Sequence, residues 1–253
     1  MKKINLLILF LFVALSINAQ HRKKSSMIKW LSFEVKGGYG TTILFNSDVS
    51  SEENTNMDHF SGAYNFGGRF GITFGDYVGI FVEGMSEHFK QEYELIPGEP
   101  LLPYTKTQDF TSMDWLFELR YTNDYGFYVE AGPVFSTLKS AEESNDEDYQ
   151  FLPRDNYIQN FSEKNTGLMF GLGMALARSE RITLSLGLRG TYMFGDFVEN
   201  DNFYVLQDGV YMPASNTGAS TNPFSIKIML GFNYFFGFWG NASCGRGRLM
   251  FFQ

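Results

Sequence analysis

Residues 60–74 read FSGAYNFGGRFGITF. Every second position, from Phe60 to Phe74, is Phe, Tyr, Ile or Gly, and the positions between them are Ser, Ala, Asn, Gly, Arg or Thr. Successive side chains of a β-strand point to opposite faces, so this period of two gives the segment one apolar face and one small or polar face. The segment therefore predicts a strand that lies between two different environments.

Seven further stretches repeat this alternation, which makes eight predicted strands. Their apolar faces run through residues 31–43, 60–74, 78–82, 115–121, 127–135, 168–176, 182–192 and 224–236. Long polar segments, which are 46–58, 94–109, 139–165 and 196–222, alternate with short turns that begin near residues 75, 122 and 178. Outer-membrane barrels have this asymmetry of connections and an even number of strands. In the third stretch the alternation weakens beyond Gly84, where we expect a β-bulge.

The direction of the apolar faces decides between two classes of protein. A secreted β-sandwich turns its apolar faces inward, whereas a membrane barrel turns them outward to lipid. Here the opposite faces combine many small residues with charges that nearly balance, namely four carboxylates and five cations. The charged positions that we assign to the lumen are Glu34, Lys36, Arg69, Glu83, Glu118, Arg120, Glu130, Arg189 and Lys227.

Small and charged side chains suit the interior of an eight-stranded barrel, which is just wide enough for its own side chains to fill. Balanced charges suit a water-poor interior, because an unpaired buried charge costs several kcal/mol. We therefore predict an all-β fold: a closed, antiparallel, eight-stranded transmembrane β-barrel with up-and-down meander topology. Its lumen is expected to be plugged by the charge network. The secreted sandwich is the alternative.

The N-terminus predicts export from the cytoplasm. Residues 1–19 combine two lysines, an apolar run and a small residue, Ala19, in the order found in secretory signal peptides. Cleavage after Ala19 removes both lysines and moves the formal net charge from −8 to −10. A chain this acidic is not expected to bind nucleic acid, which favours clustered Lys and Arg. No later segment has the roughly 20 apolar residues that a membrane-spanning helix needs.

Residues with catalytic or metal-binding chemistry are few. The only cysteine, Cys244, can form neither an intrachain disulfide nor a metal cluster. Ser86, Glu87 and His88 are hydrolase-type side chains, but neighbours on a strand point to opposite faces, so Glu87 is poorly placed to orient His88. The acidic segment 142–148 lacks the fixed spacing of a calcium loop. We therefore expect no catalytic, cofactor-binding or metal-binding residues.

Short motifs add a resemblance to a known family. Residues 127–133 (Phe-Tyr-Val-Glu-Ala-Gly-Pro), 82–84 (Val-Glu-Gly) and 18–20 (Asn-Ala-Gln), with the barrel architecture, resemble the PorT-like outer-membrane β-barrel domain family of Bacteroidota. The resemblance covers about residues 28–237, and it implies a barrel of the OmpX or OmpA kind, generally without an established activity. We accordingly divide the chain into a signal peptide, 1–19, a barrel, 28–237, and a C-terminal tail, 238–253. The tail is a departure, because such barrels usually finish on the aromatic end of the last strand.

The sequence thus predicts a non-enzymatic protein of the outer membrane whose barrel anchors four surface loops. Its expected partners are outer-membrane lipid and other envelope proteins. Two alternatives stay open. One is a subunit of an envelope secretion machine, because PorT belongs to the type IX machinery. The other is a lipid-modifying outer-membrane enzyme.

Overall fold

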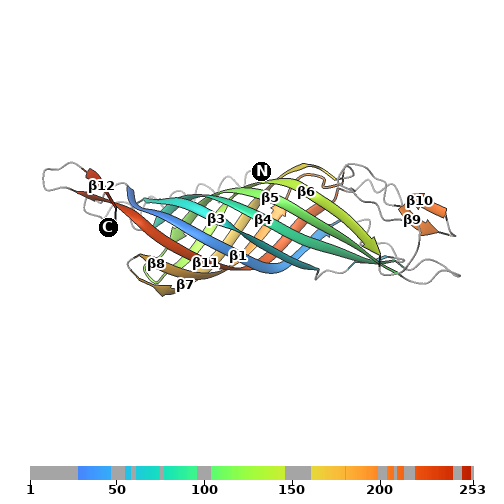
Figure 1. The fold of residues 1–253 in the computed structure, drawn as a ribbon, viewed down its shortest axis with the longest axis horizontal. Helices are drawn as coiled ribbons and strands as arrows, with labels where there is room; N and C mark the ends of the chain where they lie inside the picture. The colour runs from blue at the N-terminus through green and yellow to red at the C-terminus, as the bar shows by residue number, and fades with distance from the viewer. Residues whose placement is uncertain are drawn as a thin grey trace, which may run out of the picture.

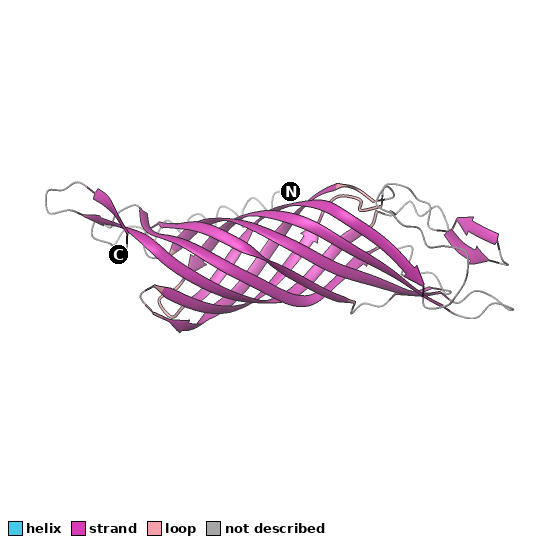
Figure 2. Cartoon of the chain, viewed as in Figure 1, coloured by secondary structure: helices cyan, strands magenta, loops and turns pink. Residues whose placement is uncertain are grey.

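The computed structural model describes eleven segments of the chain, and the regular elements in them are β-strands (Figure 2). The described residues are 28–46, 55–57, 61–74, 77–95, 104–145, 161–179, 181–198, 204–207, 210–213, 220–241 and 247–251. Within them, no helix is long and apolar enough to cross a membrane. The predicted signal peptide and Cys244 lie outside the described residues.

Eight long strands form one closed antiparallel barrel (Figure 1). They are β1(Ile28–Phe45), β3(Gly62–Phe74), β4(Val78–Leu95), β5(Tyr104–Thr122), β6(Phe127–Asn145), β7(Lys164–Arg178), β8(Ile182–Met193) and β11(Asn222–Asn241). Each strand pairs with the next in this order, and β1 pairs with β11 from Trp30↔Phe238 to Phe45↔Asn222, which closes the sheet. A closed sheet has no unpaired edge, so its backbone groups are satisfied inside lipid. The predicted fold class is confirmed.

Four short strands lie where we predicted loops or a tail. β2(Thr55–Met57) pairs with β4, and β9(Tyr204–Gln207) forms a hairpin with β10(Val210–Pro213). β12(Gly247–Phe251) pairs with the end of β11, which itself continues past the predicted boundary to Asn241. β2 and β12 bring the main sheet to ten strands. In Figure 1 the β9–β10 hairpin and β12 lie beyond opposite ends of the barrel.

The strands β4, β5 and β6 are longer than predicted, with 18, 19 and 19 residues. They include parts of the segments 94–109 and 139–165, which we had assigned to loops. Near the loop end of β4 the outward positions are polar, as at Lys90 and Glu92, while Phe89 and Tyr93 are buried. The period of two therefore continues there, but its apolar face has changed sides. Because of this reversal, the sequence pattern did not predict where these strands end.

The predicted bulge beyond Gly84 is wrong. The registers of β4 with β3 and with β5 run without a shift through Gly84 and on to Phe89. The alternation weakens in the sequence because large apolar side chains, Phe81, Met85 and Phe89, lie on the buried side of β4. A register shift does occur between β5 and β6, at Thr111/Ser112.

The distribution of side chains is the reverse of that in a water-soluble protein, because the outer surface is apolar and the interior carries charges. Large apolar side chains on the outer surface are exposed, for example Tyr39 at 68%, Phe66 at 64% and Ile228 at 59%. Charged side chains on the inner surface are buried, with Arg69 at 1% and Glu83 at 0%. The short turns, the beginning of β1 and the end of β11 all lie at the same end of the barrel. Short turns at one end and long connections at the other are typical of outer-membrane barrels.

Candidate functional site

The register of the barrel strands builds a cluster of charged side chains in the lumen. Glu34 on β1 is the register partner of Arg69 on β3, and Arg69 is the partner of Glu83 on β4. On the wall formed by the next two strands, Arg120 on β5 is the register partner of Glu130 on β6. Directly opposed residues on one face of a sheet have close Cβ atoms, so opposite charges there are favourable. The two walls together supply most of the cluster.

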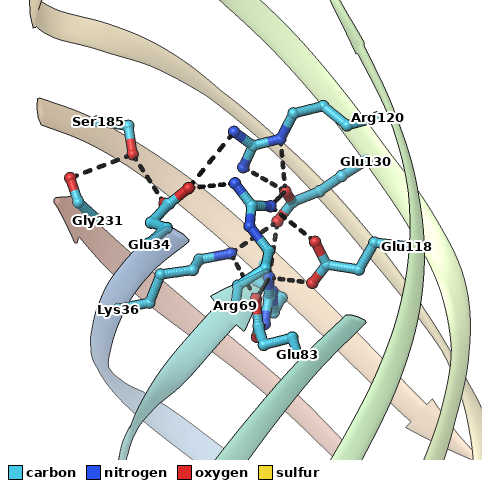
Figure 3. A network of polar contacts seen from close by, with 10 residues as sticks. Glu34, Lys36, Arg69, Glu83, Glu118, Arg120, Glu130, Ser185 and Gly231 are labelled. Carbon is cyan, nitrogen blue, oxygen red and sulfur yellow. Dashed lines mark hydrogen bonds and ion pairs between the residues drawn. The ribbon is translucent and has the colours of Figure 1, made fainter. Parts of the chain in front are cut away.

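Two arginines, Arg69 and Arg189, connect carboxylates of different strands across the lumen, and Figure 3 shows Arg69 among its partners. The Arg69 guanidinium donates to Glu34, to Glu118 Oε2 at 2.7 Å and to Glu130 Oε2 at 3.1 Å. The Arg189 guanidinium donates to both oxygens of Glu83, to Glu118 Oε1 at 2.8 Å and to Glu130 Oε1 at 2.8 Å. Each guanidinium therefore contacts three carboxylates, which its fork of five N–H donors permits.

Glu130 is the most shared carboxylate of the cluster. Its Oε2 accepts from Arg120 Nη2 at 2.6 Å and from Arg120 Nε at 3.1 Å, in addition to Arg69. Its Oε1 accepts from Arg189 and from Lys36 Nζ at 3.4 Å. Lys36 also donates to Glu83 Oε2 at 3.0 Å. All four cations of the cluster therefore meet at this one side chain.

We call this cluster the charge network, and its charges balance. The members are Glu34, Lys36, Arg69, Glu83, Glu118, Arg120, Glu130 and Arg189, which are all buried. Four carboxylates face four cations. Balance of this kind offsets the cost of removing charges from water, and breaking one pair leaves an uncompensated buried charge.

Glycine makes room for two of the network carboxylates. A Cβ on Gly231 would lie 2.0 Å from Glu34 Oε1, and a Cβ on Gly171 would lie 2.8 Å from Glu130 Cγ. Any larger residue at these two positions would displace a carboxylate from its partners. Gly171 on β7 and Gly231 on β11 therefore leave the space that these two carboxylates occupy in the lumen.

Lys227, the ninth residue that we assigned to the lumen, is buried there but lies outside the charge network. Its Nζ donates to Glu87 Oε1 at 2.6 Å and approaches Thr42 Oγ1 at 3.5 Å. Asp114, also buried, accepts hydrogen bonds at Oδ1 from the hydroxyls of Ser112 and Ser136. Neither Glu87 nor Asp114 is among the nine charged positions that we assigned to the lumen, although Asp114 shares the non-apolar face of its strand with Glu118 and Arg120. The spacing of Glu83, Met85 and Glu87 along one strand face was the signal that could have found the first.

Apolar layers also lie inside the lumen. One is a cluster of Met85, Leu116, Val134, Met169, Met193 and Met229, which we call the methionine layer. The other, which we call the aromatic plug, consists of Leu44, Ala63, Phe89, Phe110, Leu138, Ala141, Phe161 and Phe197. These layers were not predicted, because the strand pattern assigned apolar residues to lipid.

The aromatic plug is completed by residues outside the barrel strands. Phe161 precedes β7 and Phe197 follows β8, and an isolated bridge joins Phe161 to Val198. Phe110 is fully buried, and its ring lies 4.9 Å from that of Phe161 and 5.2 Å from that of Phe197, edge to face. Chain segments that leave the barrel thus pack over the end that lies opposite the short turns.

Comparison with known families agrees with this architecture. The family described as Outer membrane protein beta-barrel domain matches residues 7–210, which is most of the chain. The chain belongs to this family. It is therefore a bacterial outer-membrane β-barrel protein, as predicted, and its outer surface contacts lipid. No curated protein matches the chain.

Several solved structures of outer-membrane barrels are similar to this family member. OprG from Pseudomonas aeruginosa has a TM-score of 0.44 and 16% identity, and the match covers 82% of this chain and 97% of that chain. Neisserial surface protein A has a TM-score of 0.40, 11% identity and coverages of 81% and 96%. Ail of Yersinia pestis has a TM-score of 0.39, 11% identity and coverages of 81% and 99%. At these identities the likeness concerns the fold alone.

The barrel separates the three residues that we considered for hydrolysis. Glu87 points into the lumen to Lys227, whereas Ser86 is exposed and His88 is half-buried on the outer side. His88 Nε2 lies 3.1 Å from Asp109 Oδ1, and its Nδ1 lies 3.3 Å from Thr111 Oγ1. Within the described residues of this barrel, no group of three or more His, Cys, Asp or Glu side chains is arranged to hold a metal ion.

Proposed function

We propose that this protein is a non-enzymatic outer-membrane anchor whose lumen is closed by side chains and whose long connections act at the cell surface. The observation that carries this proposal is the stacking of different layers in one narrow barrel. The charge network, the methionine layer, the Lys227–Glu87 pair and the aromatic plug fill the inner side of the wall. Recognition at the cell surface is then left to the segments 46–58, 94–109, 139–165 and 196–222.

Closure of the lumen is directly measurable. To cross the lumen, water would have to pass the ion pairs of the charge network and two apolar layers. We therefore expect the purified protein to give no large steady current in planar lipid bilayers. A large steady current from the wild-type protein would contradict the closed lumen.

A second candidate is a subunit of an envelope secretion machine, as the PorT resemblance implies. It is supported by the C-terminal hairpin at the periplasmic end, where β12 extends β11 beyond the barrel wall. Within the described part of the chain β12 pairs with β11 alone, so its other edge is free to bind an extended segment.

Copurification separates the two candidates. The protein would be extracted from its native membrane in mild detergent and its partners identified by mass spectrometry. A secretion subunit should retain a constant set of envelope proteins, and removal of residues 242–253 should release them. Removal of residues 204–213, at the opposite end of the barrel, is the matched control. If the protein is extracted alone, the anchor is supported and the machine subunit is excluded.

A further inference from the structure

The periplasmic end of the lumen contains a cavity that the closed barrel leaves unfilled. It has a volume of about 480 Å³ and reaches the short turns, since Tyr77 and Gly126 are among its lining residues. The charge network forms its inner boundary through Glu34, Arg69 and Arg120. Cavities of roughly 300–1,000 Å³ are typical of small-molecule sites. We call this cavity the vestibule.

The lining of the vestibule carries more positive than negative charge. Three arginines, Arg69, Arg120 and Arg178, line it with a single carboxylate, Glu34. Arg120 uses Nε and Nη2 on Glu130, whereas its Nη1 has only Glu34 Oε2 at 3.9 Å and makes no hydrogen bond within the described residues. The vestibule therefore offers a cationic donor to a ligand. An anionic group suits this position.

Neutral polar groups complete the wall beside this donor. Asn233 on β11 and Thr183 on β8 are register partners, and Glu34 is the partner of Asn233 on its other side. Asn233 is 8% exposed, and neither Asn233 Oδ1 nor Thr183 Oγ1 has a hydrogen-bond partner within the described residues. Other hydroxyls line the same cavity, including Ser32, Thr73 and Thr122. Both oxygens are themselves buried, so a small rotation of either side chain toward the cavity would let a ligand hydroxyl donate to it and supply the hydrogen bond that the buried atom lacks.

We propose that the vestibule is a binding site for a small polyhydroxylated carboxylate of the sugar-acid class, open to the periplasm. The carboxylate of the ligand would accept from Arg120 Nη1. Its hydroxyls would bond to Asn233 and Thr183, because hydroxyls both donate and accept as the lining requires. Glu34, which lies next to the same donor, repels a doubly charged phosphate more than a singly charged carboxylate. Binding here requires no passage through the lumen, so this site is independent of the anchoring function.

The test is calorimetric titration of the full-length protein, folded in detergent micelles, with gluconate and with sorbitol. Sorbitol has the same hydroxylated chain with an alcohol in place of the carboxylate. Gluconate is expected to bind at least tenfold more tightly than sorbitol. Equal binding of the two, no binding of gluconate, or tighter binding of inorganic phosphate would each overturn the proposal.

Variants locate the binding in the vestibule. Asn233→Asp adds a negative charge beside the anion and should weaken gluconate binding at least tenfold. Thr183→Val removes one neutral hydrogen bond and should weaken it by roughly two- to tenfold. Thr191→Val is the control, because Thr191 lies on the same strand but lines a different cavity, on the cell-surface side. Binding that is unchanged in both vestibule variants, or is lost equally in Thr191→Val, would place the ligand elsewhere and refute the site.

Discussion

Neutralising Glu130 should destabilise the barrel more than any change at an exposed ion pair. In the Glu130→Gln variant the amide replaces a carboxylate that accepts from Arg120 at 2.6 Å, Arg189 at 2.8 Å, Arg69 at 3.1 Å and Lys36 at 3.4 Å. Four buried cations then face three carboxylates. Removal of one partner from a buried ionic group costs about 3–5 kcal/mol, so the folding equilibrium constant should fall roughly 10²- to 10⁴-fold. The assay is urea unfolding in lipid vesicles, followed by circular dichroism.

Two further variants make this prediction specific. Asp109→Asn breaks the Lys90–Asp109 pair, whose side chains are 45% and 29% exposed, and should cost about 0–1 kcal/mol. The double variant Glu130→Gln/Lys36→Met restores a balance of three charges of each sign. It should therefore be less destabilised than the sum of its single variants, because residues of one network couple. If Glu130→Gln costs no more than Asp109→Asn, the reasoning on the charge network is refuted.

Three other changes test the lipid-facing surface, the aromatic plug and the Lys227–Glu87 pair by the same unfolding assay. Ile228→Arg places a charge on the lipid-facing surface and should cost about 2–4 kcal/mol, whereas a cost near zero would contradict the lipid contact of this position. Phe110→Ala removes a ring from the aromatic plug and should cost about 3–5 kcal/mol, more than Phe117→Ala on the lipid face of the same strand; the opposite order would contradict the assignment of the two faces. Lys227→Met leaves the partly buried Glu87 without its cation and should cost about 3 kcal/mol, and the addition of Glu87→Gln should recover part of it. No recovery would show that the pair is not coupled.

The fold could be predicted from the sequence wherever the lumen side of a strand is small or polar. On β7 the exposed positions Leu168, Phe170 and Leu172 alternate with Met169 and glycines, so a period of two is evident. In such strands the period of two is enough to predict which side chains face lipid and which face the lumen. The same rule fails on β4, because the narrow lumen takes large apolar residues as well as charges.

The nine charged residues could be placed in the lumen by parity alone, but their partners could not. Arg69 on β3 pairs with Glu118 on β5 and Glu130 on β6, which do not neighbour β3, and which residues meet there depends on the register and tilt of the closed sheet. Lys227 lies beyond the methionine layer, and its position along the barrel axis separates it from the charge network. The vestibule could not be predicted for the same reason, because it is a space between strands and its shape depends on the closed sheet.

The orientation of the side chains in lipid is tested most directly on two methionines of the same strand. Met174 is 40% exposed on the outer surface of β7, whereas Met169 is 2% exposed in the methionine layer. Nuclear Overhauser contacts between methionine methyl groups and lipid acyl chains report which of the two faces the bilayer. We predict strong contacts for Met174 and none for Met169. Contacts at Met169, or their absence at Met174, would contradict a barrel whose apolar surface faces lipid and whose charges face one another.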